Sequence, residues 1–317
     1  MPDSAVHIAF GYDVLGSVGE TVRAAIVDAP FRMALLGPDP WFVYLPGRKR
    51  ENRGRRMHTE KTGDFLISLA KHCRDGAGQA TLFSYLCGFI CHYALDSAAH
   101  PYIIRMTSCE GARPGSHRAL EHALDIAQLK EIGLWGSRHP LTGSLMPSLR
   151  LPADMRGGLD AAYREIYGWE NCWSAMRKLY PFFRFLYRRM DARHGIIRFL
   201  AGITGNDNLK SLSYEMTWFS PDEAANASHA AWCSAYDSSL ISTDSFADLR
   251  SAALKRASCM ISEAWSFCFT SAADPDALAA SFGNMSYYSG LPCDDVRNLN
   301  VPSLSPYPGV VNTSTCQ

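Results

Sequence analysis

Three titratable side chains recur at every fourth residue of an otherwise apolar stretch, and their types are those of metal ligands. His92, Asp96 and His100 lie in the segment LFSYLCGFICHYALDSAAHPYII, which begins at Leu82. At 100° per residue, a spacing of four moves each side chain only about 40° around a helix, so the three form one polar stripe. A carboxylate on such a helix is costly unless protons or a metal ion pair with it. The stripe therefore predicts a buried proton-sharing network or a metal site.

Further residues of the same types stand before and after this stripe. His117 and Glu121 repeat the spacing of four and share a helix face, whereas His122 points about 100° away. Prolines on both sides of Asp39 disfavour an α-helix and hold its carboxylate on a stiff turn. Taken singly, Asp39 also fits an ordinary turn residue, and His7 fits a packed histidine. The candidates in chain order are His7, Asp39, His58, His92, Asp96, His100, His117 and Glu121.

This set of side chains favours zinc. Imidazole with carboxylate is the usual ligand set of catalytic zinc, which keeps one position open for water. Eight ligands exceed what one four-coordinate ion can use, so two or three ions are implied. His92 and His100 lie about 12 Å apart along a helix axis, so they should serve different ions, with Asp96 bridging two of them. The expected groups are His100 with His117 and Glu121, and Asp39 with His58, His92 and Asp96.

Helices must position these ligands. Apolar spacing predicts one or two helices over residues 5 to 28, broken near Gly16 and Gly19, and another after His58 that ends near His72. Pro101 biases its predecessor away from the α region, so the central helix should end or kink at His100. Ser116 is a plausible N-cap for the helix that follows.

The second half of the chain also has helical periodicity. The pattern resumes at Leu159 and continues to about residue 205, and Ser245 with Asp248 has capping-box spacing before a helix that ends at Phe269. Its aromatic stripe is expected in the core: Trp169, Trp173, Tyr180, Phe183, Phe185 and Tyr187. Strand patterns are scarce. We therefore predict an all-α protein of nine or ten helices, with one domain over residues 1–283 and an irregular segment over 284–317, packed on it or loose.

The composition indicates a globular protein but does not identify a binding partner. The chain has 317 residues, 47% hydrophobic and 20% charged, which is typical of a globular protein. Thirty-one basic residues balance 31 acidic ones, which disfavours a wholesale nucleic-acid or anionic-membrane surface. The basic run from Arg48 to Arg56 is expected to be a solvated loop, although its place between Asp39 and His58 would bring positive charge near a bound phosphate.

The sequence also sets an expectation for the compartment. No signal peptide is visible at the N-terminus, so a cytoplasmic location is expected. The ten cysteines are scattered and favour free thiols over a disulfide framework. The longest apolar run is interrupted by His92 and Asp96, which argues against a transmembrane segment. No motif sets the oligomeric state.

The order of these residues is similar to that of a known family. His7, then Pro38-Asp39, then His58, then HYALDSAAH from His92, then HRALE from His117 resembles the zinc-dependent phospholipase C family over at least residues 5 to 125. The resemblance implies an all-α fold with a zinc cluster at the bottom of a cleft. It assigns the first two ions to the groups given above and a third to His7, shared with Asp96. The N-terminal tryptophan that completes this third site in secreted members has no counterpart here, so two zinc ions are expected and the third is left open.

The reaction implied is hydrolysis of a phosphoester by a metal-activated water. Two cations about 3.5 to 4 Å apart bind phosphate oxygens and lower the pKa of water towards about 7. Asp39 would orient or deprotonate that water, or serve as a ligand alone. The leading substrate is a phospholipid cleaved at its glycerol-phosphate bond. The alternatives are a single-strand nuclease or nucleotidase of the same fold, which the neutral charge disfavours, and a zinc-binding protein with little catalytic activity.

Overall fold

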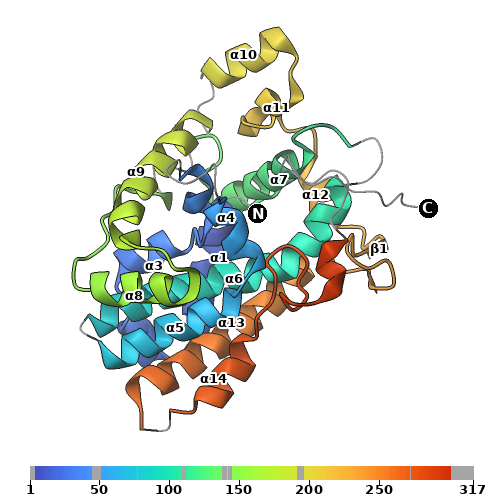
Figure 1. Ribbon diagram of the computed structural model, residues 1–317. Coiled ribbons are helices and arrows are strands. Elements are labelled where there is room, and N and C mark those ends of the chain that lie inside the picture. The colour runs from blue at the N-terminus through green and yellow to red at the C-terminus, as the bar shows by residue number, and fades with distance from the viewer. Residues whose placement is uncertain are drawn as a thin grey trace.

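The computed structural model of the protein describes residues 4–44, 51–76, 78–108, 112–137, 141, 145–190, 196–271 and 273–300. These residues form an assembly of helices with one two-stranded antiparallel sheet (Figure 1). The all-α prediction is confirmed. The elements are α1 (Ser4–Ser17), α2 (Glu20–Ala24), α3 (Asp28–Ala34), η1 (Asp39–Val43), α4 (Arg53–Thr59), α5 (Thr62–Asp75), α6 (Gln79–Thr107), α7 (Ser116–Glu131), α8 (Arg156–Tyr167), α9 (Cys172–Met190), α10 (Ile196–Thr204), α11 (Asp207–Lys210), η3 (Tyr214–Met216), α12 (Pro221–Ala224), β1 (Trp232–Cys233), β2 (Ile241–Ser242), α13 (Phe246–Phe269), α14 (Pro275–Phe282) and η4 (Val296–Leu299).

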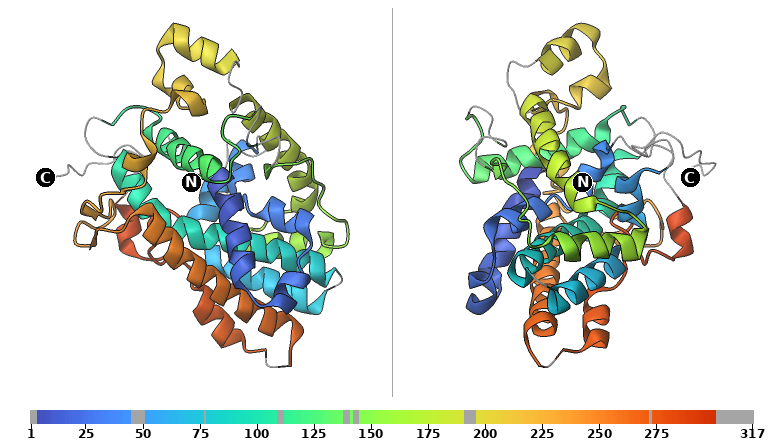
Figure 2. Two further views of the ribbon diagram at one scale, coloured as in Figure 1. Left: turned by 180° about the vertical axis from the view of Figure 1, so that it is seen from behind. Right: turned by 60° about the vertical axis from the view of Figure 1, so that its left-hand side comes forward.

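Helix α6 is the axis of the fold. Its 29 residues span about 43 Å, and its side chains are buried on every side from Leu82 to Ile104 with few exceptions. A helix that is apolar all round needs neighbours all round. Helices α1, α3, α5, α7 and α13 supply them (Figures 1 and 2). The polar stripe of α6 is therefore enclosed by protein.

The predicted break points in the first segment are confirmed. Helix α1 ends at Ser17 and α2 begins at Glu20, next to Gly19. His58 lies in the last turn of α4, and α5 then runs past His72 to Asp75. The capping box at α13 is also present, because Ser245 and Asp248 exchange hydrogen bonds between side chain and backbone. The described residues contain more helices than expected, since short ones such as α2, α11 and α12 are too brief for a periodic signal.

Two predicted helix boundaries are wrong. Helix α6 continues through Pro101 to Thr107 instead of ending at His100. The proline removes one hydrogen bond to the carbonyl of Ser97, and packing outweighs this loss. Gly290 lies against that carbonyl, because a Cβ at 290 would stand 2.5 Å from the oxygen of Ser97. The N-cap of α7 is Gly115 in the left-handed region, and Ser116 is the first helical residue.

The basic run was predicted to be a solvated loop, and this is wrong for its second half. Arg48 to Arg50 lie outside the described residues. From Arg53 the chain is helical, and the Arg53 guanidinium lies over three aromatic rings that it contacts by cation–π interaction. These rings belong to Trp41, Tyr44 and Trp169. Arg53 is thus a packing residue of the fold.

The aromatic stripe over α8 and α9 lies in the core with one exception. Trp169, Trp173, Tyr180, Phe183 and Tyr187 are all buried. The side chain of Phe185 is 48% exposed, so the prediction is wrong for this residue. Residues 183 and 187 occupy the packed face of α9, whereas position 185 lies about 200° away from 183 on the opposite side. None of the described helices is both long and apolar enough to cross a membrane.

Candidate metal centre

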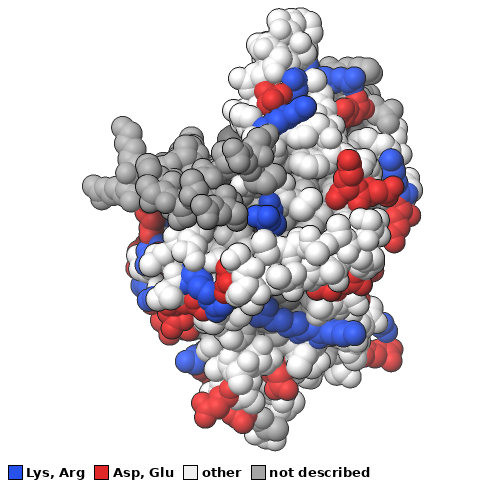
Figure 3. All heavy atoms as spheres, turned by 90° about the vertical axis from the view of Figure 1, so that its right-hand side faces the viewer, with Lys and Arg blue, Asp and Glu red and all other residues white. Residues whose placement is uncertain are grey.

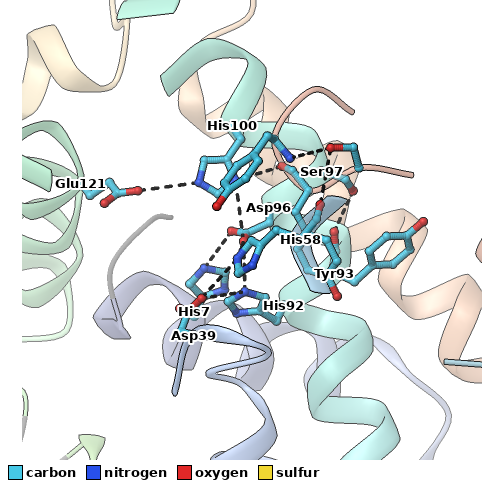
Figure 4. Close-up of polar contacts among 12 residues, drawn as sticks. His7, Asp39, His58, His92, Tyr93, Asp96, Ser97, His100 and Glu121 are labelled. Atoms are coloured by element: carbon cyan, nitrogen blue, oxygen red, sulfur yellow. Dashed lines mark hydrogen bonds and ion pairs between the residues drawn. The ribbon is translucent and has the colours of Figure 1, made fainter. Parts of the chain in front are cut away.

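Five of the predicted ligands meet in a buried group centred on Asp96 (Figure 4). We call His7, Asp39, His58, His92 and Asp96 the inner cluster. Oδ1 of Asp96 lies 3.1 Å from Nε2 of His7, and Oδ2 lies 3.0 Å from Nε2 of His92. Nε2 of His58 is 3.4 Å from Oδ1 of Asp39 and 3.8 Å from Oδ2 of Asp96. Donor atoms within 4.8 Å of one another form two overlapping groups, His7–His92–Asp96 and Asp39–His58–His92.

Backbone carbonyls fix the imidazoles that these groups use. Nδ1 of His92 donates to the carbonyl of Leu35 at 3.0 Å, and Nδ1 of His58 donates to that of Gly54 at 2.7 Å. Such bonds set the tautomer, which leaves Nε2 with its lone pair towards the cluster. His92 therefore has one lone pair and can bind one ion. The two carboxylate oxygens of Asp96 face different imidazoles, so each oxygen can bind a separate ion.

The turn that carries Asp39 is built around the His92 ring. Residues 39–43 form the 3₁₀-helix η1, the tight helix that the flanking prolines permit in place of an α-helix. Gly37, just before it, has φ +50°, and a Cβ there would lie 2.3 Å from Cδ2 of His92. Only glycine is compatible with both the backbone angle and the close ring. The Gly-Pro pair marks Gly37 as a turn residue in the sequence, but its contact with the His92 ring is formed only in the folded chain.

The remaining three ligands form a second group, which we call the outer cluster: His100, His117 and Glu121. Oε1 of Glu121 lies 2.9 Å from Nε2 of His117 and 3.8 Å from Nε2 of His100. The two imidazoles are parallel, with centroids 5.6 Å apart. Nδ1 of His100 donates to the carbonyl of Tyr287 at 3.0 Å, so its Nε2 faces Glu121. The side chains of His117 and Glu121 are 12% and 8% exposed, whereas that of His100 is fully buried.

Residues at the far end of the chain cover both clusters. The ring of Tyr288 is parallel to that of His58 at 5.2 Å and lies edge-on to His100 at 5.6 Å. The backbone N–H of Tyr287 donates to the carbonyl of His58, and its own carbonyl accepts from His100. No local pattern marks these two tyrosines, because their contacts with the ligands are formed only in the folded chain.

Helix α7 also holds His7 in place. The buried carboxylate of Asp125 accepts hydrogen bonds from the backbone N–H groups of Ala5 and Val6 at 3.0 and 2.9 Å, and from the hydroxyl of Tyr214 at 2.8 Å. It thereby caps the first turn of α1, where a negative charge also complements the helix dipole. His7 lies in that turn. His122, on the same helix, stacks on Tyr214 away from the ligands, as its spacing predicts.

The chemistry of the donor atoms is compatible with a bound cation. Within the described residues, several buried ligand atoms make no hydrogen bond: both ring nitrogens of His7, Oδ1 of Asp39, Nε2 of His92, both carboxylate oxygens of Asp96 and Nε2 of His100. Buried polar atoms are nearly always paired, and leaving one unpaired costs about 1–3 kcal/mol. Several of these atoms face one another as imidazole–carboxylate contacts of 3.0 to 3.8 Å, an arrangement that a shared cation would also hold together. The residues present therefore fit zinc, which imidazole and carboxylate bind.

Electrostatics separate the imidazoles into two kinds. Burial lowers the pKa of His100 and of His117 well below the ordinary value, and it also lowers the pKa of His7, so these rings are neutral and ready to bind a cation. Burial alone would lower the pKa of His92 as well, but the charges of Asp96 and Asp39 raise it. Burial opposes ionisation of Asp96, yet the neighbouring imidazoles, His92 foremost, hold the pKa of this carboxyl well below its usual range.

All eight residues singled out from the sequence thus lie together in the fold, in the inner and outer clusters, while their role as ligands remains a prediction. The sequence model of the family described as zinc-dependent phospholipase C matches residues 7–169, a span that includes all eight. No curated protein and no solved structure matches the chain. The family match covers half of the chain and includes every element that carries a candidate ligand, and on this ground the chain belongs to the zinc-dependent phospholipase C family.

Proposed function

We propose that the protein is a zinc-dependent phosphodiesterase that hydrolyses a phospholipid in the manner of a phospholipase C. The observation that carries this proposal is the meeting of three donor groups around one α-helix, two of which share His92, with the ligand atoms of each group within 4.8 Å of one another. Two zinc ions would be held by Asp39, His58, His92 and Asp96, and by His100, His117 and Glu121. A third would be held by His7 with Asp96. Membership of the zinc-dependent phospholipase C family supports the same assignment.

Zinc at these positions would supply Lewis acidity for phosphate oxygens and would lower the pKa of bound water from about 15.7 towards about 7. The residues of the chain supply orientation and a proton acceptor. Side chains of His58, His92 and Asp96 are fully buried, whereas 7% of the Asp39 side chain is exposed. This difference supports a role for Asp39 in contact with the attacking water. We propose that one of its oxygens orients this water and accepts its proton.

Substrate assays with purified protein test the proposal directly. Phosphatidylcholine micelles, single-stranded DNA and bis(p-nitrophenyl) phosphate would be compared with and without a chelator, and zinc per chain would be measured in the same samples. We expect chelator-sensitive release of phosphocholine to exceed any cleavage of DNA. Cleavage of DNA alone would replace the proposal by a nuclease function. Fewer than one zinc ion per chain, with activity that resists chelation, would exclude a zinc hydrolase altogether.

The role of Asp39 needs its own variant. Asp39→Asn keeps the size of the side chain and removes the proton acceptor, so kcat should fall about 10²–10⁴-fold, the typical contribution of a general base. The control is Asp222→Asn at an exposed position of α12, which should retain the wild-type rate. Zinc content distinguishes the two roles of Asp39. A loss of zinc in proportion to the loss of rate would leave Asp39 as a ligand only.

A further inference from the structure

Two successive helices, α9 and α10, expose aromatic side chains to an unusual degree. Phe182 and Phe185 on α9 are 43% and 48% exposed, and Phe199 on α10 is 65% exposed. These are all the exposed phenylalanines in the described part of the chain. Leu200 and Ile203 on α10 are 42% and 68% exposed. Single exposed apolar residues are ordinary, but five large ones on two contacting helices call for a partner.

Helix α10 is apolar on two sides. Ala201 is buried and Ile197 half-buried, and these two lie one turn apart on the side that packs on the protein. Phe199, Leu200 and Ile203 occupy an arc of about 100° on the opposite side. Figures 1 and 2 show α10 at one end of the molecule, beyond the helices that surround α6. Its outer face is therefore presented outwards and has no partner among the described residues.

Helix α9 combines the apolar residues with positive charge. It contains five basic side chains and no acidic one: Arg177, Lys178, Arg184, Arg188 and Arg189. Lys178, Phe182, Phe185 and Arg189 are spaced by four, three and four residues, so they form one exposed stripe with basic ends and an aromatic middle. The guanidinium of Arg189 lies 5.0 Å from the centroid of the Phe185 ring. Although the chain as a whole is neutral, this stripe is locally basic.

We propose that α9 and α10 form the surface by which the protein binds a phospholipid bilayer that carries anionic headgroups. This inference rests on the proposed function, since it supplies the contact with a lipid substrate. Aromatic and aliphatic side chains enter the boundary between headgroups and acyl chains, and lysine and arginine remain at the headgroups. Each basic side chain near an anionic surface contributes about 1 kcal/mol, or about fivefold in affinity.

Charge also argues against a second copy of the chain as the partner. A two-fold contact through this surface would bring the same patch of each subunit together, and the basic stripes of α9 would repel each other. The only basic residue of α10, Arg198, already pairs with Glu215 and adds nothing to either contact. In Figure 3 the end of the molecule at the height of α10 is mostly uncharged, with both basic and acidic atoms next to it.

The surface is coupled to the metal centre through η1. Helix α9 packs on η1, and Asp39 is the first residue of η1. The helix that carries the basic stripe thus contacts the element that carries the proposed proton acceptor. A bilayer bound at α9 and α10 would lie on the part of the molecule adjoining the inner cluster.

Vesicle co-sedimentation of the zinc-loaded protein tests this surface without depending on catalysis. Vesicles of phosphatidylcholine alone and of phosphatidylcholine with phosphatidylglycerol would be compared. We expect tighter binding to the anionic vesicles. Phe199→Ser with Ile203→Ser should weaken binding at least about tenfold on both. Lys178→Glu with Arg189→Glu should weaken binding to the anionic vesicles by about 25-fold or more, and much less to the neutral ones.

Matched variants elsewhere on the surface give the controls. Ile241→Ser on β2 removes a side chain that is 71% exposed, and Lys71→Glu with Lys255→Glu reverses two exposed charges on α5 and α13. Both should leave binding unchanged. All variants should hydrolyse bis(p-nitrophenyl) phosphate at the wild-type rate, which separates this surface from the reaction. The proposal is overturned if the wild type does not bind vesicles, or if the wild type and the variants bind equally. It is also overturned if the wild type is a dimer and the Phe199→Ser, Ile203→Ser variant is a monomer.

Discussion

The inner and outer clusters use the same chemistry but are assembled in different ways. The inner cluster gathers its five residues from α1, η1, α4 and α6, and the His7 and His92 rings stack with centroids 4.1 Å apart. The outer cluster draws three residues from α6 and α7, which are successive in the chain. The His117 side chain is 12% exposed, the most of the eight ligands, whereas Glu121 at 8% and Asp39 at 7% are similarly buried.

This difference separates a site that depends on the whole fold from one that depends mainly on helix spacing. Bringing four elements together around a buried carboxylate costs conformational entropy and desolvation, which ion binding at the inner cluster offsets. The outer cluster needs only one helix-to-helix contact and keeps a side open to solvent. We therefore expect the inner cluster to contribute more to folding and the outer cluster to exchange its ion more readily.

The largest expected effect comes from Asp96→Asn. The substitution removes the one carboxylate whose two oxygens face both groups of the inner cluster, so both ion positions there should be lost. Hydrolysis of bis(p-nitrophenyl) phosphate should fall by more than about 100-fold. A loss of about 100-fold is the most expected when a residue that only supports a metal ligand is changed. Zinc per chain is measured by atomic absorption, with Asp222→Asn as the surface control. An unchanged zinc content would refute the central role of Asp96.

A smaller effect is expected for His117→Gln in the outer cluster. One ion should be lost while the inner cluster keeps its zinc, because His117 belongs to the donor group of His100 and Glu121. Zinc per chain should therefore fall by about one. The thermal unfolding midpoint should change less than in Asp96→Asn. His229→Gln at an exposed position gives the control. Equal losses of zinc from both variants would mean that the two clusters form a single cooperative site.

Gly37→Ala perturbs the inner cluster without removing a ligand. The new Cβ would overlap the His92 ring, and the positive φ adds about 1–2 kcal/mol of strain. Zinc affinity of the inner cluster should fall about 10–100-fold, with the outer cluster unchanged. Gly168→Ala is a matched control, because Gly168 has φ +71° and an added Cβ there would meet nothing within 4 Å. Competition with a fluorescent chelator measures the affinity, and similar behaviour of both variants would attribute the effect to backbone strain.

The smallest effect is the pH dependence of the zinc-free protein, to which His100 and His92 should contribute with opposite sign. Burial lowers the folded-state pKa of His100, so the unfolded chain binds more protons and stability falls as pH drops below about 6.5. His92 has a raised folded-state pKa, so its contribution is present at low pH and is lost as pH rises through that value. His100→Gln should flatten the loss of stability on acidification, and His92→Gln should steepen it. Urea unfolding at about pH 7.5 and about pH 5.5 measures both slopes.

The sequence by itself determined the helical class and the residues that cluster. Spacings of four put His92, Asp96 and His100 on one face of a helix and His117 with Glu121 on another, because the angle per residue is a local property of the backbone. The proline-flanked Asp39 was recognisable for the same local reason. The sequence also placed Phe185 in the core, since periodicity alone cannot tell which face of an aromatic helix meets the protein.

Only the tertiary structure decided how the ligands are shared and supported. The carbonyls of Leu35, Gly54 and Tyr287 select the ring nitrogens, and these contacts join residues up to 187 positions apart. The continuation of α6 past Pro101 was also a tertiary outcome, since burial of the helix outweighs one lost hydrogen bond. Local geometry fixes which side chains share a face, whereas packing between distant elements fixes which atoms of those side chains remain available to bind an ion.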